Sequence, residues 1–211
     1  MIQRIITLTI LTSTLLFVFG SQSVSAFTGD SCDLKQITQV LQSQESLHQF
    51  SQEKHIKVLA NPLKSSGYLL LADNDAVVWQ TLKPIKSTTV ISELEFKQFN
   101  KNDQPVSMPT NSDNQTSQLI SSTFLSILSG NLNSLNANFE VEALCDQSSW
   151  DIRLTPTNPR IKRMIKLIQI DGSGHIEHLS FSEANDDTTK LLFTPVSEPL
   201  IKKQLGSYLV D

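Results

Sequence analysis

Hydrophobic and polar residues alternate most clearly between residues 67 and 92. Four apolar side chains share one parity here, so strands would place them on one face of a sheet: Leu69, Leu71, Val77 and Trp79. Polar residues 73–75 form a turn between the first two strands, and Pro84 precedes the third. The pattern predicts strands over 67–72, 76–83, 87–93 and 94–99.

Helical spacing of apolar residues occurs in two other segments. Asp33 is placed to cap a short helix that contains Ile37 and Leu41. The polar composition of residues 100–118 predicts a long exposed loop, which a second helix follows before Gly130. The apolar face of this helix is wide: Leu119, Ile120, Phe124, Leu125, Ile127 and Leu128. Two interpretations stay open, namely ordinary core packing or a helix that covers an apolar cavity.

The remaining segments again have the alternation of strands. Strands are predicted over 50–54, 139–143, 150–154, 161–170, 175–183 and 189–194. Short polar turns at 171–174 and 185–187 connect the last three of them. Such connections predict an antiparallel meander, and a single large sheet of this kind curls. We expect only the two helices above to cover its concave side.

The first 26 residues have the composition of a secretory signal peptide. Arg4 precedes an apolar run over 5–20, and Val24-Ser25-Ala26 supplies small residues for cleavage. A transmembrane anchor is the alternative, because the run is close to spanning length. Several threonines and a serine dilute the run, however. We therefore expect cleavage after Ala26, a periplasmic location and one domain over 27–211.

Charge and motifs narrow the possible functions. The 211-residue chain has a net charge of −4 and no basic stripe, which argues against nucleic acid or permanent membrane-surface binding. No GxSxG, HExxH or phosphate-loop motif occurs, so we expect no enzyme, no metal and no cofactor. His175 and His178 would lie on opposite faces of a strand. We interpret His48 and His55 as surface residues and Asp186-Asp187 as a solvated turn.

Cys32 and Cys145 are the two cysteines of the chain. An even pair in an oxidising compartment is favoured to form a disulfide, which would join the first helix to a late strand. A bridge that closes so long a loop stabilises the fold by about 4–5 kcal/mol in the chain-entropy description. Neither cysteine belongs to a CxxC pair, so redox catalysis has little support. Free reactive thiols are the alternative.

The order of several short motifs resembles the LolA family of periplasmic lipoprotein carriers. The first group follows the initial helix and comprises Phe50-Ser51-Gln52, GYLLL at 67–71, Trp79, Lys83-Pro84, Ser87 and Val90-Ile91. The second group comprises WDIRLTP at 150–156, DGSG at 171–174, Phe181 and Phe193-Thr194-Pro195. The resemblance spans about residues 33–196. It implies an α+β fold in which an unclosed antiparallel β-barrel, with helices as a lid, encloses an apolar cavity for acyl chains.

One turn departs from the family pattern. Asp73 and Asn74 stand where these carriers have an arginine followed by a proline, and that arginine controls cavity closure and lipoprotein handling. The resemblance therefore supports the cavity more strongly than the usual cargo. We predict a cavity wall and lid formed by Leu69, Leu71, Val77, Trp79, Ile91, Ile152, Leu154 and Phe181, with Phe124, Leu125 and Leu128 on the lid. The alternative for each is a place in a solid core.

The resemblance implies a carrier or chaperone that acts as a monomer. Its partners would be a lipoprotein or other acylated cargo, an inner-membrane donor and an outer-membrane acceptor. A lipid-sensing or interaction module on the same fold is the first alternative. An accessory factor that delivers one lipid-linked product of a biosynthetic pathway is the second.

Overall fold

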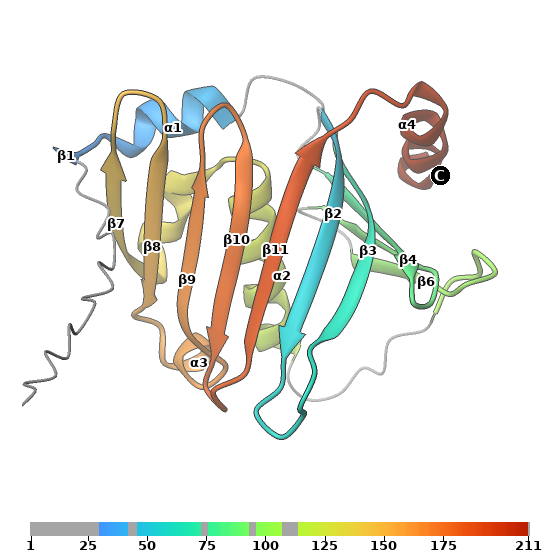
Figure 1. Cartoon of the computed structure of the whole chain (residues 1–211), viewed down its shortest axis with the longest axis horizontal. Coiled ribbons are helices and arrows are strands. Elements are labelled where there is room, and N and C mark those ends of the chain that lie inside the picture. Colours follow the sequence, from blue (N-terminus) through green and yellow to red (C-terminus); the bar gives the residue numbers. More distant parts are fainter. Residues whose placement is uncertain (1–29, 42–45, 73–75, 93–95, 107–113, 211) are drawn as a thin grey trace, which may run out of the picture.

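The protein is described by a computed structural model that covers residues 30–41, 46–72, 76–92, 96–106 and 114–210. The predicted signal peptide and the turn at 73–75 lie outside these described residues. The described chain forms one curled eleven-stranded sheet with short helices on both faces (Figure 1). None of the helices within those ranges has the length and apolar composition needed to cross a bilayer.

Two antiparallel meanders build the sheet. The first comprises β2 (Ser46–His55), β3 (Leu63–Leu71), β4 (Val77–Lys83), β5 (Ser87–Ile91) and β6 (Phe96–Phe99). The second comprises β7 (Phe139–Cys145), β8 (Trp150–Pro156), β9 (Ile165–Gly172), β10 (Ile176–Glu183) and β11 (Thr188–Pro195). A two-residue strand, β1 (Asp30–Ser31), pairs with β7 at one edge.

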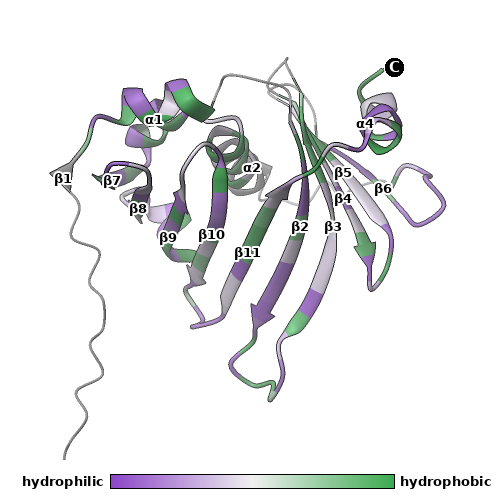
Figure 2. Ribbon diagram, turned by 45° about the horizontal axis from the view of Figure 1, so that its top comes forward, coloured by the Kyte–Doolittle hydropathy of each residue, from purple (hydrophilic) through white to green (hydrophobic). Residues whose placement is uncertain are grey.

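The last strand joins the two meanders. β11 pairs with β2 in antiparallel register, from Thr188 opposite His55 to Pro195 opposite His48. The strand order is therefore β1-β7-β8-β9-β10-β11-β2-β3-β4-β5-β6, and the edges β1 and β6 stay apart. The expected single, antiparallel and unclosed sheet is confirmed. Its right-handed twist accumulates over many strands and produces the concave face seen in Figure 2.

Helices cover the concave face. They are α1 (Leu34–Leu41), α2 (Asn114–Leu128), the 3₁₀ helix η1 (Leu132–Ala137) and the single turn α3 (Pro159–Lys162). The predicted cap of α1 is confirmed, because Asp33 Oδ1 accepts a hydrogen bond from the backbone N–H of Lys35 at 2.9 Å. The end of α2 is confirmed too, since Gly130 has a φ of 74°. This helix begins at Asn114, so the loop expected to reach residue 118 ends earlier.

Two expectations about the second half of the chain are wrong. The strand predicted over 161–170 begins only at Ile165, because residues 159–162 form the helical turn α3. Asn158 caps that turn by accepting a hydrogen bond from the N–H of Arg160, and proline follows it. The two expected helices are also not alone over the concave side, because η1 and α3 contribute to the inner cluster. Besides η1 and α3, α4 (Pro199–Gly206) and the 3₁₀ helix η2 (Ser207–Leu209) follow β11.

The C-terminal helix α4 covers part of the outer, convex face. Its Leu205 is fully buried in a small apolar cluster with four strand residues: Leu47, Leu70, Val78 and Val90. The neighbouring residues of opposite parity, Leu69 and Val77, belong to the larger inner cluster. Both faces of β3 and β4 are thus buried here, which explains why Leu69-Leu70-Leu71 and Val77-Val78 are continuously apolar.

Gly67 lets β3 approach β4 closely. A Cβ at this position would lie 1.9 Å from the backbone oxygen of Gln80, beside a register shift in the pairing of the two strands. We expect Gly67→Ala to lower the free energy of unfolding by about 3 kcal/mol in urea titrations, because the backbone of β3 or β4 must move to make room for the methyl group. Gly206→Ala is the control, since a Cβ there meets nothing within 4 Å. Equal losses in the two variants would contradict this account.

Candidate functional site

The concave face and the helices over it enclose one continuous apolar cluster. Five predicted wall and lid residues are buried in it: Leu69, Val77, Leu128, Ile152 and Leu154. The other six are partly buried and pack against it: Leu71, Trp79, Ile91, Phe124, Leu125 and Phe181. The structure therefore brings all the predicted residues into one interior. That they bind a ligand stays a prediction.

Aromatic rings connect the strands and the helix across this interior. Trp79 of β4 packs on Phe50 of β2, with ring centroids 4.5 Å apart, and forms a T-shaped pair with Phe193 of β11 at 6.1 Å. Phe124 of α2 meets Phe181 of β10 edge-to-face at 5.3 Å. The helix is held on the sheet in part by this apolar contact, which an apolar ligand can replace without leaving a polar group unpaired.

A cavity of about 250 Å³ opens at one end of the interior, between α1, the end of α2 and the strands. Three of the predicted residues line it, namely Leu69, Leu71 and Leu128. The other predicted residues lie in the surrounding cluster. The cavity is slightly smaller than the roughly 300–1,000 Å³ typical of small-molecule sites. An extended acyl chain therefore needs α1 or α2 to shift.

His48 lines this cavity, and its interpretation as a surface residue is wrong. Only 5% of the residue is exposed, and Nδ1 has no hydrogen-bond partner in the structure. Burial, and to a smaller extent the charge of His175, lower the pKa of His48 to about 4. Strand parity was the signal in the sequence that could have placed His48 in the interior. Because β2 begins at Ser46, His48 faces the same side as Phe50.

The other histidines lie as predicted. His175 lines the cavity, whereas the exposed His178 contacts Asp171 Oδ2 through Nδ1 at 2.7 Å. The two therefore lie on opposite sides of the sheet. His55 is exposed and lies 3.7 Å from a carboxylate oxygen of Glu53. Within the described ranges, no three histidine, cysteine or acidic side chains come together as a metal site would require.

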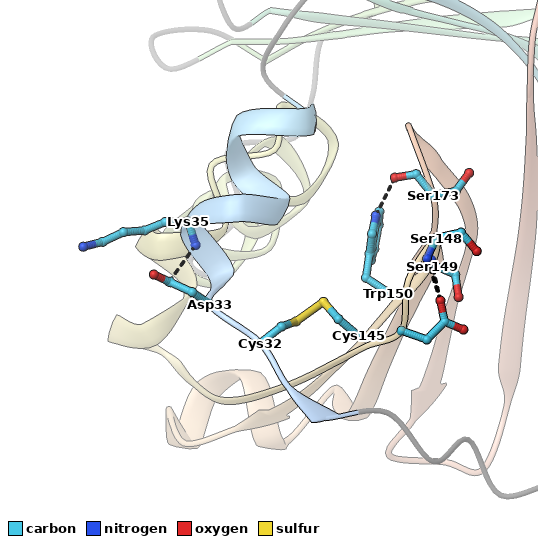
Figure 3. Close-up of a disulfide and its surroundings, with 9 residues drawn as sticks. Cys32, Asp33, Lys35, Cys145, Ser148, Ser149, Trp150 and Ser173 are labelled. Atoms are coloured by element: carbon cyan, nitrogen blue, oxygen red, sulfur yellow. Dashed lines mark hydrogen bonds between the residues drawn. A yellow bond between two sulfur atoms is a disulfide. The ribbon is translucent and has the colours of Figure 1, made fainter.

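A disulfide holds the start of α1 against the edge of the sheet (Figure 3). Cys32, directly before the helix, is bonded to Cys145 at the end of β7, which confirms the predicted bridge. Nearby, Trp150 Nε1–H donates a hydrogen bond to the carbonyl of Ser173 at 2.8 Å and so joins β8 to the β9–β10 hairpin. Both contacts position elements beside the cavity, since α1 contributes Val40 and the β9–β10 hairpin contributes Gly174 to its lining.

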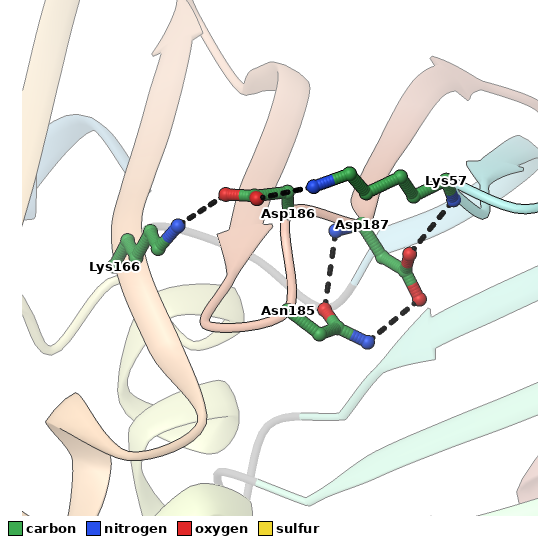
Figure 4. A network of polar contacts seen from close by, with 5 residues as sticks. All are labelled: Lys57, Lys166, Asn185, Asp186 and Asp187. Carbon is green, nitrogen blue, oxygen red and sulfur yellow. Dashed lines mark hydrogen bonds and ion pairs between the residues drawn. The ribbon is translucent and has the colours of Figure 1, made fainter.

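A charged network connects the loops at the far end of the sheet (Figure 4). Asp186 pairs with Lys57, 3.0 Å away, and with Lys166, and these lysines lower the pKa of Asp186 to about 2. Asp187 is 7% exposed and accepts hydrogen bonds from the backbone N–H of Lys57 and the side chain of Asn185, both at 2.9 Å. The expectation of a solvated turn is therefore wrong for Asp187.

Comparisons with known proteins give one family and structures of low sequence identity. The sequence matches a family described as "Outer membrane lipoprotein carrier protein LolA-like" over residues 26–185. No curated protein matches the chain significantly. A LolA superfamily protein from Nitrosomonas europaea is 7% identical, with a TM-score of 0.41, over 80% of this chain and 95% of that one. A putative outer membrane lipoprotein-sorting protein domain from Vibrio parahaemolyticus is 9% identical, with a TM-score of 0.37, over 82% and 96%.

Proposed function

Because the chain belongs to the LolA-like outer membrane lipoprotein carrier family, we propose that it is a periplasmic carrier. It binds the acyl chains of a lipoprotein or lipid-linked product in its apolar interior and delivers the cargo towards the outer membrane. The observation that carries this proposal is the continuous apolar cluster between the concave sheet and its covering helices, which opens into a cavity.

The energetics of an acyl chain favour such an interior. Moving an acyl chain from water into an apolar interior lowers the free energy by about 0.8 kcal/mol for each buried methylene. Part of that gain is offset, because the chain must displace contacts such as that between Phe124 and Phe181. The exchange of helix contacts for ligand contacts keeps the affinity moderate. A carrier needs this property, since it must release its cargo to an acceptor.

The cargo is proposed to be specialised rather than any outer-membrane lipoprotein. Asp73 and Asn74 lie outside the described residues, and the family resemblance aligns them with an arginine and a proline of the related carriers. An acidic residue at position 73 lacks the positive charge that, by this resemblance, supports general lipoprotein handling. This difference favours a factor that serves one biosynthetic pathway. Genes for acyl-chain synthesis and acyltransferases beside this one would support that role, and their absence would favour general sorting.

Native mass spectrometry tests the carrier function directly. Protein purified from its own periplasm is expected to carry adducts with the masses of lipids or acylated proteins. A fluorescent fatty acid is expected to bind the stripped protein and to be displaced by unlabelled fatty acid. If neither adducts nor probe binding are found with folded protein, the proposed function is wrong.

Filling the cavity is expected to block the ligand without unfolding the protein. Leu71 is partly buried and lines the cavity, so an indole at this position occupies space that the chain would use. We expect Leu71→Trp to weaken fatty-acid binding about tenfold, the equivalent of excluding roughly two methylenes. Leu82→Trp is the matched control, because Leu82 is 41% exposed and belongs neither to the cavity lining nor to the inner cluster. Unchanged binding by Leu71→Trp would place the ligand elsewhere.

A further inference from the structure

Two imidazole rings interrupt the largely apolar lining of the cavity. His48 comes from β2 and His175 from the hairpin that precedes β10. Their ring centroids are 5.6 Å apart and the ring planes are inclined by 33°, so the rings lie beside each other. His48 also forms a T-shaped pair with Phe193, with ring centroids 6.5 Å apart. The two histidines are the only titratable residues among the described residues that line this cavity.

Packing alone does not account for a histidine at position 48. Nδ1 is buried without a hydrogen-bond partner, which costs stability compared with an apolar side chain of similar size. The neighbouring positions of the cavity show that the fold accepts apolar residues here, since Leu69 and Phe193 complete the same wall. A buried ring nitrogen without a partner, on a side chain that lines a cavity, indicates a role beyond packing, and a ligand atom in the cavity can pair with the ring.

The protonation state defines which ligand atom fits. The lowered pKa of His48, about 4, keeps its ring neutral at the pH of the periplasm. A neutral imidazole has one N–H donor and one acceptor nitrogen, and a half-turn of the ring about Cβ–Cγ exchanges the positions of its two nitrogens. The ring therefore offers a hydrogen bond to an uncharged oxygen without needing a counter-charge.

We propose that His48 and His175 form a polar site for the carbonyl oxygen of an acyl group. This inference rests on the proposed carrier function and adds to it the orientation of the bound acyl chain. The imidazole N–H donates to the carbonyl oxygen, and the alkyl chain extends from there along Leu69 and Leu71 into the apolar interior. Ester- and amide-linked acyl chains carry this oxygen, and a free fatty acid carries it in its protonated form, so both are candidate ligands.

Ligands with a ten-carbon chain, with and without a carbonyl oxygen, test this site. Decane, methyl decanoate and decanoic acid are competed against the neutral probe N-phenyl-1-naphthylamine on wild-type protein, His48→Leu and the outward-facing control His178→Leu. We expect His48→Leu to weaken the two carbonyl ligands about fivefold, as for one lost hydrogen bond, and to leave decane within about twofold. We expect His178→Leu to change none of them.

The outcomes separate this inference from the carrier function. Equal weakening of decane and the carbonyl ligands by His48→Leu, or no weakening at all, would overturn the carbonyl site while leaving an acyl-binding cavity in place. If the wild-type protein binds neither the probe nor any ligand, both proposals fail. Weakening of the acid alone would also overturn the carbonyl site, because the ester offers the same oxygen. The source of the acyl group follows from the wild-type protein, since tighter binding of the acid would identify a free fatty acid and tighter binding of the ester would identify linked chains. His48→Gln, which keeps an N–H donor, is expected to recover part of the loss.

Discussion

Replacement of both cysteines by serine is expected to lower the free energy of unfolding by about 4–5 kcal/mol. Cys32 and Cys145 are 113 residues apart in sequence, so their bond restricts a large part of the unfolded chain. Serine has nearly the same size as cysteine, and both residues are only partly buried in the folded protein. The loss therefore arises mainly from the greater entropy of the unfolded state. Equilibrium urea denaturation of the variant and the oxidised wild type measures it.

The reduced wild-type protein is the control for this double variant. It should unfold at the same urea concentration as the variant, because both lack the same constraint. A second readout is hydrogen exchange in α1, which lines the cavity. The bridge and the two-residue strand β1 attach the start of this helix to the edge of the sheet. Exchange there should increase more than in β2 or β11. A loss below about 1 kcal/mol would show that the bridge does not constrain the fold.

Local patterns predicted the strands and their connections well. The hairpin at 171–174 and the cap at Asp33 each follow from side-chain chemistry that acts over a few residues. The turn α3 was missed although Asn158 and Pro159 are a typical helix start. Its four residues are too few for apolar periodicity to show, so the alternation of the following strand appeared to extend through them.

Non-local pairing explains what could not be predicted. Nothing in the local pattern places β11 beside β2, yet this pairing brings Phe193 opposite Phe50 and forms the central wall of the interior. Parity correctly grouped Leu69 with Trp79, because it depends only on the strand itself. His48 was missed because the strand was expected to start at Phe50. The volume of the cavity depends on how the helices pack, which no single segment determines.

Replacement of Trp79 by aspartate is expected to have the largest effect on cargo binding. Trp79 packs between Phe50 and Phe193 and belongs to the apolar cluster that surrounds the cavity. An acyl chain in this interior would lie beside a carboxylate, which must either lose its hydration or keep water in the apolar interior. Both cost free energy, so we expect binding of a fluorescent fatty acid to weaken on the order of 30-fold. Loss of the indole also lowers the free energy of unfolding, by about 3–5 kcal/mol.

Two neighbours on β4 separate the binding effect of Trp79→Asp from its effect on folding. Thr81→Asp introduces the same charge on the same face but outside the apolar cluster, so its binding should stay within about threefold of wild type. Val78→Ala destabilises the outer cluster under α4 without touching the interior, so it should lose stability and keep affinity. If Trp79→Asp and Val78→Ala weaken binding alike at equal folded fraction, stability explains the loss. Trp79 then has no part in holding the chain.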